Sequence, residues 1–557
     1  FLKKVKELSG IVRYKNQYIM IDQKEIEKLL KATEKGEPKF NSTALLRLGI
    51  ERTYNDVPLQ LSAAIQKLLD NLFKVKKTKI PDNLDATLRE YQERGFHWLN
   101  HNAKLGLGSI IADDMGLGKT IQVITFLLAN KTKNKSAKPA LIVVPTSLLT
   151  NWNKEFEKFA PSLDISTFHG SQRILNTDVD AVLTTYGIVR SDNLMLKKQK
   201  WDYLIIDEAQ NIKNPQTGQC KAVKNLPAAI RIAMTGTPVE NSLMEYWSIM
   251  DFLNKGLLGS YAGFRKEFAV PIEKERDQDK LQQFLKISSP FILRRTKEDK
   301  NISKDLPDKI IMNRYCNLTT AQSALYQNVV DESIALMSDT QPESQIQRKG
   351  MIFKLITSLK QICNHPYNFL KEGDLALENS GKAIILLELL NKILSLREKC
   401  LIFTQYKEMG TILEKTLKQN FATDPLFLHG GLSRKKRDEM ISKFENDPTA
   451  RIFILSLKAG GTGLNLTAAN HVIHYDLWWN PAVENQATDR AFRIGQHKNV
   501  NVYRFITEGT FEEKIDQMLQ SKKELFDISV KKGESWISDL SNTDLKQLVS
   551  LASTNPT

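Results

Sequence analysis

The chain has 557 residues, of which 41% are hydrophobic and 26% charged, ordinary values for a globular protein that exclude wholesale disorder. It has 79 Lys and Arg against 64 Asp and Glu, a net charge of +15, which favours a polyanionic partner such as nucleic acid. Neither a signal-peptide pattern nor an apolar run approaching the roughly 20 residues that cross a bilayer is present. We therefore expect a soluble, intracellular protein with no membrane partner.

The order of strand-like and helix-like segments predicts two α/β lobes. The first 80 residues are basic, with 17 Lys and Arg against nine Asp and Glu. Short apolar runs then alternate with helical patterns, as in parallel sheets covered by helices on both faces. The predicted strand runs are 109–113, 140–145, 181–186, 203–207, 231–236, 399–404, 425–429, 451–456, 471–476 and 500–506. The expected regions are a mainly helical accessory region (1–82), a first lobe with the start of a helical insertion (83–300), the insertion (301–375), a second lobe (376–525) and a C-terminal brace and tail (526–557).

The first chemical motif is a Gly-rich loop between a strand-like run and a helical one. Such a loop binds phosphate because its backbone N–H groups converge at the positive end of a helix. Lys119 is expected to reach the β and γ phosphates of ATP, and the Thr120 hydroxyl to ligate Mg²⁺. Asp113 occupies a position where the strict phosphate-loop pattern has Gly. The expected phosphate-binding residues are Asp114, Met115, Gly116, Leu117, Gly118, Lys119 and Thr120.

An acidic pair follows the apolar run that ends at Ile206. Asp207 is placed to hold Mg²⁺, and Glu208 to orient or deprotonate the attacking water. An acidic pair after a strand also occurs at the start of many helices. The phosphate loop upstream is what favours the catalytic interpretation.

A third motif supplies positive charge. Phosphoryl transfer develops charge on the γ-phosphate oxygens, so a cationic group must meet them, and in two-lobed ATPases it can come from the opposite lobe. Gln486, Arg490 and Arg493 are spaced by four and three residues, which places them on one face of a helix. The alternative is an exposed helix that happens to carry two arginines.

These motifs, in this order, resemble the Swi/Snf branch of the superfamily-two helicase-like ATPases, the DNA-translocating and chromatin-remodelling type. In that family the position of Asp113 commonly carries Asp. Gln210, where many eukaryotic relatives have His, resembles bacterial and archaeal members. The matching segments are 88–92, 113–120, 144–152, 184–187, 207–210 and 235–238 in the first lobe, 359–366 between the lobes, and 401–405, 429–431, 456–465, 478–481 and 486–496 in the second lobe.

The resemblance implies two tandem RecA-like lobes with helical insertions between them, using ATP and Mg²⁺. Gln92 would read the adenine edge, and Arg490 and Arg493 would be arginine fingers that act when the cleft closes. Thr235 and Thr237 would couple the nucleotide site to the DNA path. The DNA-contacting residues that the resemblance implies are Thr146, Asn151, Thr185, Gln405, Lys458 and Thr462.

The implied function is an ATP-dependent translocase on double-stranded DNA, gripping the phosphate backbone without reading sequence. It would remodel or displace DNA-bound complexes such as nucleosomes or RNA polymerase. Two alternatives stay open: a strand-separating helicase on DNA or RNA, and a nucleotide-switched DNA-binding scaffold with little turnover. A metabolic kinase is disfavoured, because no substrate-specific site is visible.

Overall fold

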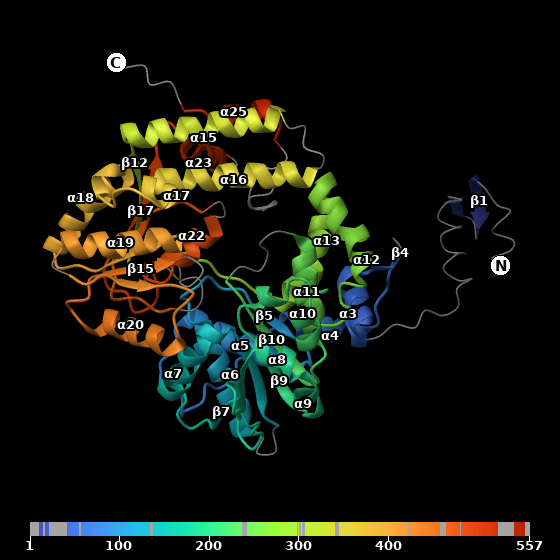
Figure 1. The fold of residues 1–557 in the computed structure, drawn as a ribbon. Coiled ribbons are helices and arrows are strands. Elements are labelled where there is room, and N and C mark those ends of the chain that lie inside the picture. The colour runs from blue at the N-terminus through green and yellow to red at the C-terminus, as the bar shows by residue number, and fades with distance from the viewer. Residues whose placement is uncertain are drawn as a thin grey trace.

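Two lobes, each built on a parallel β-sheet flanked by helices, make up the body of the protein (Figure 1). The structure is a computed structural model. It describes residues 10–14, 17–21, 42–54, 57–133, 138–236, 242–297, 299, 302, 307–339, 345–421, 423–456, 464–478, 481–521 and 540–551. The two parallel sheets confirm the predicted α/β fold class.

The N-terminal region mixes strands and helices, whereas a mainly helical region was predicted. The described part contains two antiparallel strand pairs beside two helices. The residues of the longer pair are rich in Ile, Val and Tyr, which favour strands. Ile50, Leu69 and Leu72 from the helices join the core of lobe 1. The elements are β1 (Gly10–Tyr14), β2 (Gln17–Ile21), α3 (Ser42–Glu51), β3 (Thr53–Tyr54), β4 (Val57–Pro58) and α4 (Ala63–Phe73).

Lobe 1 contains a seven-stranded sheet in the order β11-β5-β10-β9-β6-β8-β7, with every pairing parallel. Every residue of the central strands β5, β6 and β8 is buried, which explains their continuous apolar runs. The strands are β5 (Ser109–Ile111), β6 (Ala140–Val144), β7 (Ile165–Thr167), β8 (Ala181–Thr185), β9 (Trp201–Ile206), β10 (Ala228–Met234) and β11 (Ile292–Leu293).

Two hydrophobic clusters cover the faces of this sheet. Alternate residues of a strand point to opposite faces, so Leu141 and Val143 of β6 join one cluster while Ile142 and Val144 join the other. The second cluster also holds Trp152, a point used below. The main helices are α5 (Glu90–Lys104), α6 (Lys119–Lys133), α7 (Leu149–Phe159), α8 (Tyr186–Ser191), α9 (Asn193–Lys198), α10 (Gly218–Lys224), α11 (Leu243–Leu253), α12 (Tyr261–Phe264) and α13 (Gln278–Ser288).

Lobe 2 contains a six-stranded parallel sheet in the order β12-β17-β16-β13-β15-β14. Strand β12 lies inside the range 301–375, which was predicted as helical. It occupies the sheet edge, and Ile310 and Ile311, which point to opposite faces, are both exposed, as is Tyr315, so no buried apolar run marks it. The strands are β12 (Lys309–Cys316), β13 (Cys400–Thr404), β14 (Leu426–Leu428), β15 (Ile452–Ser456), β16 (His471–His474) and β17 (Val500–Thr507).

The helical insertion packs onto lobe 2 and the C-terminal helices (Figure 1). The side chain of Tyr326 lies in this cluster, and its hydroxyl donates to the carbonyl oxygen of Val549 at 2.8 Å. The insertion comprises α15 (Thr320–Asp339), α16 (Gln345–Asn364) and α17 (Pro366–Leu370). Lobe 2 and the C-terminal part add α18 (Gly381–Ser395), α19 (Lys407–Asn420), α20 (Arg434–Asn446), α22 (Pro481–Thr488), α23 (Phe511–Ser521) and α25 (Asn542–Val549).

Among the residues described, no helix combines the length and apolar character that a membrane crossing requires. Cys220, Cys316, Cys363 and Cys400 are all buried and free of disulfides.

Candidate active site

The predicted phosphate loop connects β5 to α6. Gly116 and Gly118 have φ of +87° and +74°, a backbone conformation that favours glycine. The Lys119 Nζ donates hydrogen bonds to the carbonyl oxygens of Asp113 at 2.7 Å and Asp114 at 3.2 Å. Burial lowers the pKa of Lys119, against the opposing effect of the Glu208 and Asp113 carboxylates. The side chain of Lys119, the first residue of α6, is therefore bonded back to the phosphate loop that precedes the helix.

Asp113 anchors the loop through an arginine that sequence reasoning did not identify. Its side chain is fully buried, and Arg295 Nε donates to its Oδ1 at 2.9 Å while Arg295 Nη2 pairs with its other oxygen. Arg295 follows β11, which adjoins β5 in the sheet, and its Nη2 also donates to Gln122 Oε1 at 2.7 Å. The carboxylate at the position where the strict pattern has Gly thus ties the loop to the edge of the sheet.

The two acids lie at the end of β9. Asp207 accepts hydrogen bonds from Trp152 Nε1 at 2.9 Å and from the backbone N–H of Glu208 at 2.8 Å. Burial and the neighbouring Glu208 charge raise the pKa of Asp207 to about 7. Glu208 has a φ of +51°, a strained conformation for a residue with a side chain, of the kind that recurs at functional sites. The Tyr186 hydroxyl donates to the carbonyl oxygen of Asp207 at 2.6 Å and fixes this turn.

A short chain of hydrogen bonds joins Glu208 to the end of β10. Gln210 Nε2 donates to Glu208 Oε2 at 2.8 Å, and Thr235 Oγ1 donates to Gln210 Oε1 at 3.0 Å. Thr235 and Thr237 were expected to couple the nucleotide site to the DNA path. The structure describes Thr235, whereas Thr237 lies outside the described residues. The glutamine at position 210 is thus the link between the acid and the segment that follows β10.

Both predicted arginines reach the phosphate loop from lobe 2. Arg490 is fully buried, with its Nη2 3.6 Å from the sulfur of Met115. Arg493 lies so close to Gly116 that a Cβ there would approach Arg493 Cγ to 2.7 Å. Burial, with Arg493 nearby, lowers the pKa of Arg490 to about 10.

The spacing predicted that the two arginines share one helical face with Gln486, but they do not. Helix α22 carries the half-buried Gln486 and ends at Thr488, and the arginines lie in the turns that follow it. In those turns the backbone comes close to the loop of lobe 1, since a Cβ at Gly116 would lie 3.2 Å from the Cα of Arg493.

Gln92 lies against the phosphate loop. Its Nε2 donates to the carbonyl oxygen of Leu117 at 3.2 Å, and its Oε1 accepts from the backbone N–H of Arg89 at 3.0 Å. Leu117 itself is buried. Asp114 faces the other side and accepts the backbone N–H of Lys297 at 2.9 Å.

Part of this set lines a cavity of about 560 Å³, a size typical of pockets for small ligands and cofactors, whereas Arg490 is fully buried and does not line it. The cavity brings together the phosphate loop and the two acids of lobe 1 with Arg493 of lobe 2. Its lining includes Gln92, Met115, Gly116, Gly118, Lys119, Thr120, Glu155, Asp207 and Glu208 from lobe 1, and Asn465, Arg493, Ile494 and Gly495 from lobe 2.

The donor set of this cavity fits Mg²⁺ bound together with a nucleotide. The Thr120 hydroxyl and the Asp207 carboxylate are hard oxygen donors, and Mg²⁺ is usually held by one or two carboxylates with phosphates and waters completing its shell. Within the part of the chain that the structure describes, no three His, Cys, Asp or Glu side chains lie together so that they could hold a metal ion.

Glu155 is a cavity residue that the sequence reasoning missed. Its carboxylate accepts from Asn151 Nδ2 at 2.8 Å and hydrogen-bonds to Thr120, and burial raises its pKa. The sequence feature that could have identified Glu155 is its position three residues after Trp152 on α7, because residues three apart lie on one helical face.

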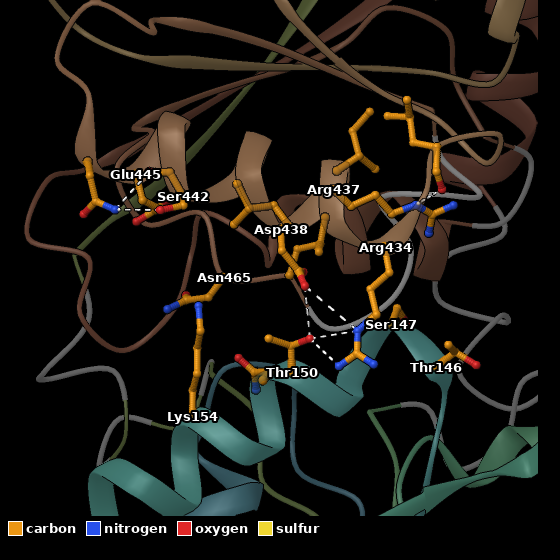
Figure 2. Close-up of a pocket in the computed structure, with 16 residues that line it drawn as sticks. Thr146, Ser147, Thr150, Lys154, Arg434, Arg437, Asp438, Ser442, Glu445 and Asn465 are labelled. Carbon is orange, nitrogen blue, oxygen red and sulfur yellow. Dashed lines mark hydrogen bonds and ion pairs between the residues drawn. The ribbon is translucent and has the colours of Figure 1, made fainter. Parts of the chain in front are cut away.

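A second cavity, of about 480 Å³, lies where α7 of lobe 1 meets α20 of lobe 2. Figure 2 shows Arg434 and Asp438 reaching Thr150 across the two lobes. Arg434 Nη2 donates to Thr150 Oγ1 at 2.6 Å, and Thr150 donates to Asp438 Oδ2 at 3.2 Å. The two cavities have three lining residues in common, Asn151, Lys154 and Asn465.

The predicted DNA-contacting residues do not all lie together in the structure. Thr146 and Asn151 line the second cavity. Thr185 is buried and its hydroxyl accepts the backbone N–H of Ile188, which makes it a helix cap. Gln405 donates through Nε2 to the carbonyl oxygen of Leu477 at 2.7 Å. Lys458 and Thr462 lie outside the described residues.

Comparisons with known proteins agree with these motifs. The SNF2-related domain matches residues 91–368, and the helicase conserved C-terminal domain matches residues 381–495. The chain is similar to the Bacillus subtilis protein YwqA, whose name describes an ATP-dependent helicase/translocase, with 41% identity over 98% of this chain and 62% of YwqA. It is also similar to the TATA-binding protein-associated factor MOT1 of Saccharomyces cerevisiae, with 34% identity over 87% of this chain and 30% of MOT1.

Among solved structures, a Sulfolobus solfataricus SWI2/SNF2 ATPase core in complex with dsDNA is 47% identical, covering 86% of this chain and all of that one, with a TM-score of 0.43. The chain spans less than two thirds of the length of YwqA and of MOT1. The two family domains follow one another across both lobes, and the chain therefore belongs to the SNF2-related family of helicase-like ATPases.

Proposed function

We propose that the chain is the motor of a Swi/Snf-type translocase, which couples ATP hydrolysis to movement along double-stranded DNA and to remodelling or displacement of DNA-bound proteins. One observation carries the proposal. Arg493 of lobe 2 lines the same cavity as Asp207 and Glu208 of lobe 1. The buried Arg490 lies against Met115 of the phosphate loop, which also lines that cavity. A catalytic set divided between two lobes makes hydrolysis depend on their relative position.

In the proposed reaction the loop N–H groups and Lys119 hold the phosphates of ATP. Thr120 and Asp207 would hold Mg²⁺, which would supply positive charge to the phosphate oxygens. Glu208 orients the attacking water and accepts its proton. Arg490 and Arg493 stabilise the charge that develops on the γ-phosphate. Gln92, held on the loop by Leu117, lies at the edge of the cavity where the base would enter.

The grip on DNA is proposed to lie at the second cavity. Lys154, Arg434 and Arg437 supply positive charge there, and phosphate contacts of this kind bind DNA without reading its sequence. Since Asn151, Lys154 and Asn465 also line the ATP cavity, a change in one cavity alters the wall of the other. The name of MOT1 supports a DNA-bound protein as the partner. The proposed place of action is inside the cell, in the cytoplasm or nucleoid of a prokaryote or in the nucleus of a eukaryote.

The deciding experiment measures ATP turnover without nucleic acid and then with single-stranded DNA, double-stranded DNA or RNA. We expect double-stranded DNA to stimulate turnover most, and the absence of stimulation would refute the proposal. Triplex displacement without unwinding of a forked duplex separates a translocase from a strand-separating helicase. Glu208→Gln should lower turnover at least about 100-fold while ATP still binds. A variant that keeps its DNA-dependent function would instead identify a nucleotide-switched scaffold.

A further inference from the structure

Lys297 connects the two lobes at the phosphate loop. It lies in lobe 1, shortly after β11, and its Nζ donates to Asp489 Oδ1 at 2.6 Å and to the carbonyl oxygen of Phe492 at 2.5 Å in lobe 2. The ammonium also lies 4.5 Å from the centre of the Phe492 ring, a favourable cation–π contact. The side chains of Lys297 and Asp489 are only 8% and 13% exposed, so solvent screens this pair weakly.

The two lobe 2 residues that Lys297 binds directly precede the two arginines. Asp489 is followed by Arg490, and Phe492 by Arg493. On its other side, the backbone N–H of Lys297 donates to the Asp114 carboxylate of the phosphate loop at 2.9 Å. One residue is therefore bonded both to the loop that would hold the phosphates and to the turn that carries the arginines.

We propose that Lys297 is a positioning residue that sets the register of Arg490 and Arg493 against the phosphate loop. The inference rests on the proposed function, because it assigns the arginines to the γ-phosphate. The physical reason is geometric: charge stabilisation requires the cation to meet the developing oxyanion, and a displacement of about 1 Å can lower the rate by about 100-fold. A buried ion pair with a second hydrogen bond to the backbone restrains the turn at two points.

The charges around Lys297 make the contact sensitive to pH. Burial lowers the pKa of Lys297 to about 8, the Asp489 carboxylate opposes this shift, and Arg493 and Lys309 add to it. Asp114 and Arg294 complete the charged surroundings. Above about pH 8 the ammonium loses its proton and the ion pair weakens. Arginine at this position would stay charged.

The test replaces Lys297 by Met, which keeps the bulk of the side chain and the backbone N–H that binds Asp114. Turnover stimulated by DNA should fall about 10- to 100-fold, while the Kd for a fluorescent ATP analogue changes less than about 2-fold. Lys309→Met is the matched control, because that ammonium lies 5.7 Å from the same ring but belongs to lobe 2. It should keep wild-type turnover.

Two further variants sharpen the result. Lys297→Met combined with Asp489→Asn should lose no more turnover than the single Lys297 variant, since both changes break one interaction. Lys297→Arg should retain turnover and lose the decline above about pH 8. Three results would overturn the inference. The first is equal turnover of the Lys297→Met and Lys309→Met variants, and the second is a loss of ATP affinity in Lys297→Met as large as its loss of turnover. The third is an additive loss of turnover in the double variant.

A readout that needs no turnover separates this inference from the proposed function. Fluorescent labels at Lys197→Cys on α9 and Gln419→Cys on α19, both exposed, report the separation of the lobes by energy transfer. The four native cysteines are buried. Lys297→Met should shift the transfer efficiency in the absence of ATP, and Lys309→Met should not. An unshifted efficiency refutes the role of Lys297, whereas a wild-type chain without turnover refutes only the proposed function.

Discussion

Replacing Arg295 by Met should destabilise lobe 1 more than any surface change, because it leaves a buried charge without its partner. Asp113 is fully buried, and once the guanidinium is gone its remaining side-chain partner is Gln122, whose Nε2 lies 3.4 Å away. Removing one member of a buried ion pair typically costs about 3 to 5 kcal/mol of unfolding free energy.

Unfolding in urea, followed by tryptophan fluorescence, measures this cost. Trp98, Trp152, Trp201 and Trp247 all lie in lobe 1, out of seven tryptophans in the chain. With a denaturant slope of about 3 kcal/mol per molar urea, the midpoint should fall by about 1 to 1.7 M. A shift below about 0.3 M would refute the assignment of Asp113 as a charged anchor.

A double variant isolates the cause. With Asp113→Asn added to Arg295→Met, no buried charge remains, so most of the lost stability should return. If the double variant is as unstable as Arg295→Met, the loss comes from packing of the arginine and not from the orphaned carboxylate.

The remaining predictions concern single contacts. Trp152→Phe removes the N–H that holds Asp207 but keeps an aromatic ring, so half-maximal turnover should need about 10- to 100-fold more Mg²⁺; an unchanged requirement would contradict the role of the indole. Lys154→Ala should weaken DNA binding and reduce its log–log salt slope by about 1, whereas Lys198→Ala on exposed α9 should leave the slope unchanged. Burial lowers the pKa of His474 from 6.5 to about 3, so the neutral ring stabilises lobe 2 fully above about pH 6.5 and this stability, up to ~5 kcal/mol, is lost as the pH falls toward 3. In thermal melts, His474→Gln should reduce the fall in melting temperature between about pH 6.5 and pH 3. An equal fall in the wild type and the variant would contradict this role of His474.

Residues at the ends of buried strands were predictable because their neighbours leave a clear pattern. The runs leading into Asp207 and the phosphate loop are apolar on both faces of the sheet, as parallel strands require. Their chemistry follows directly from the residue types at the strand ends. The strand β12 gave no such pattern, because residues on both of its faces are exposed or only half-buried.

The anchoring residues were not predictable, since tertiary structure alone brings them together. Arg295 is 182 positions from Asp113, and Lys297 is 192 positions from Asp489. A basic residue far from its acid has no local spacing that identifies it. The end of α22 before Arg490 was missed for the same reason: contact with the other lobe, rather than helix propensity, favours the turn there.

The anchored segment after β11 has a mechanical consequence for the lobes. The first sheet ends with Leu293 and the second begins with Lys309, but Arg295 and the backbone of Lys297 are bonded to the phosphate loop. The chain that leaves the first sheet is therefore fixed at the phosphate loop, and the buried Ile302 further along packs with Tyr91 and with Leu117 of that loop. Since Asp113, Asp114 and Leu117 belong to the phosphate loop, a force that separates the lobes acts on that loop through these contacts. A load on the DNA that drives the lobes apart would be transmitted through the backbone to the place where ATP binds.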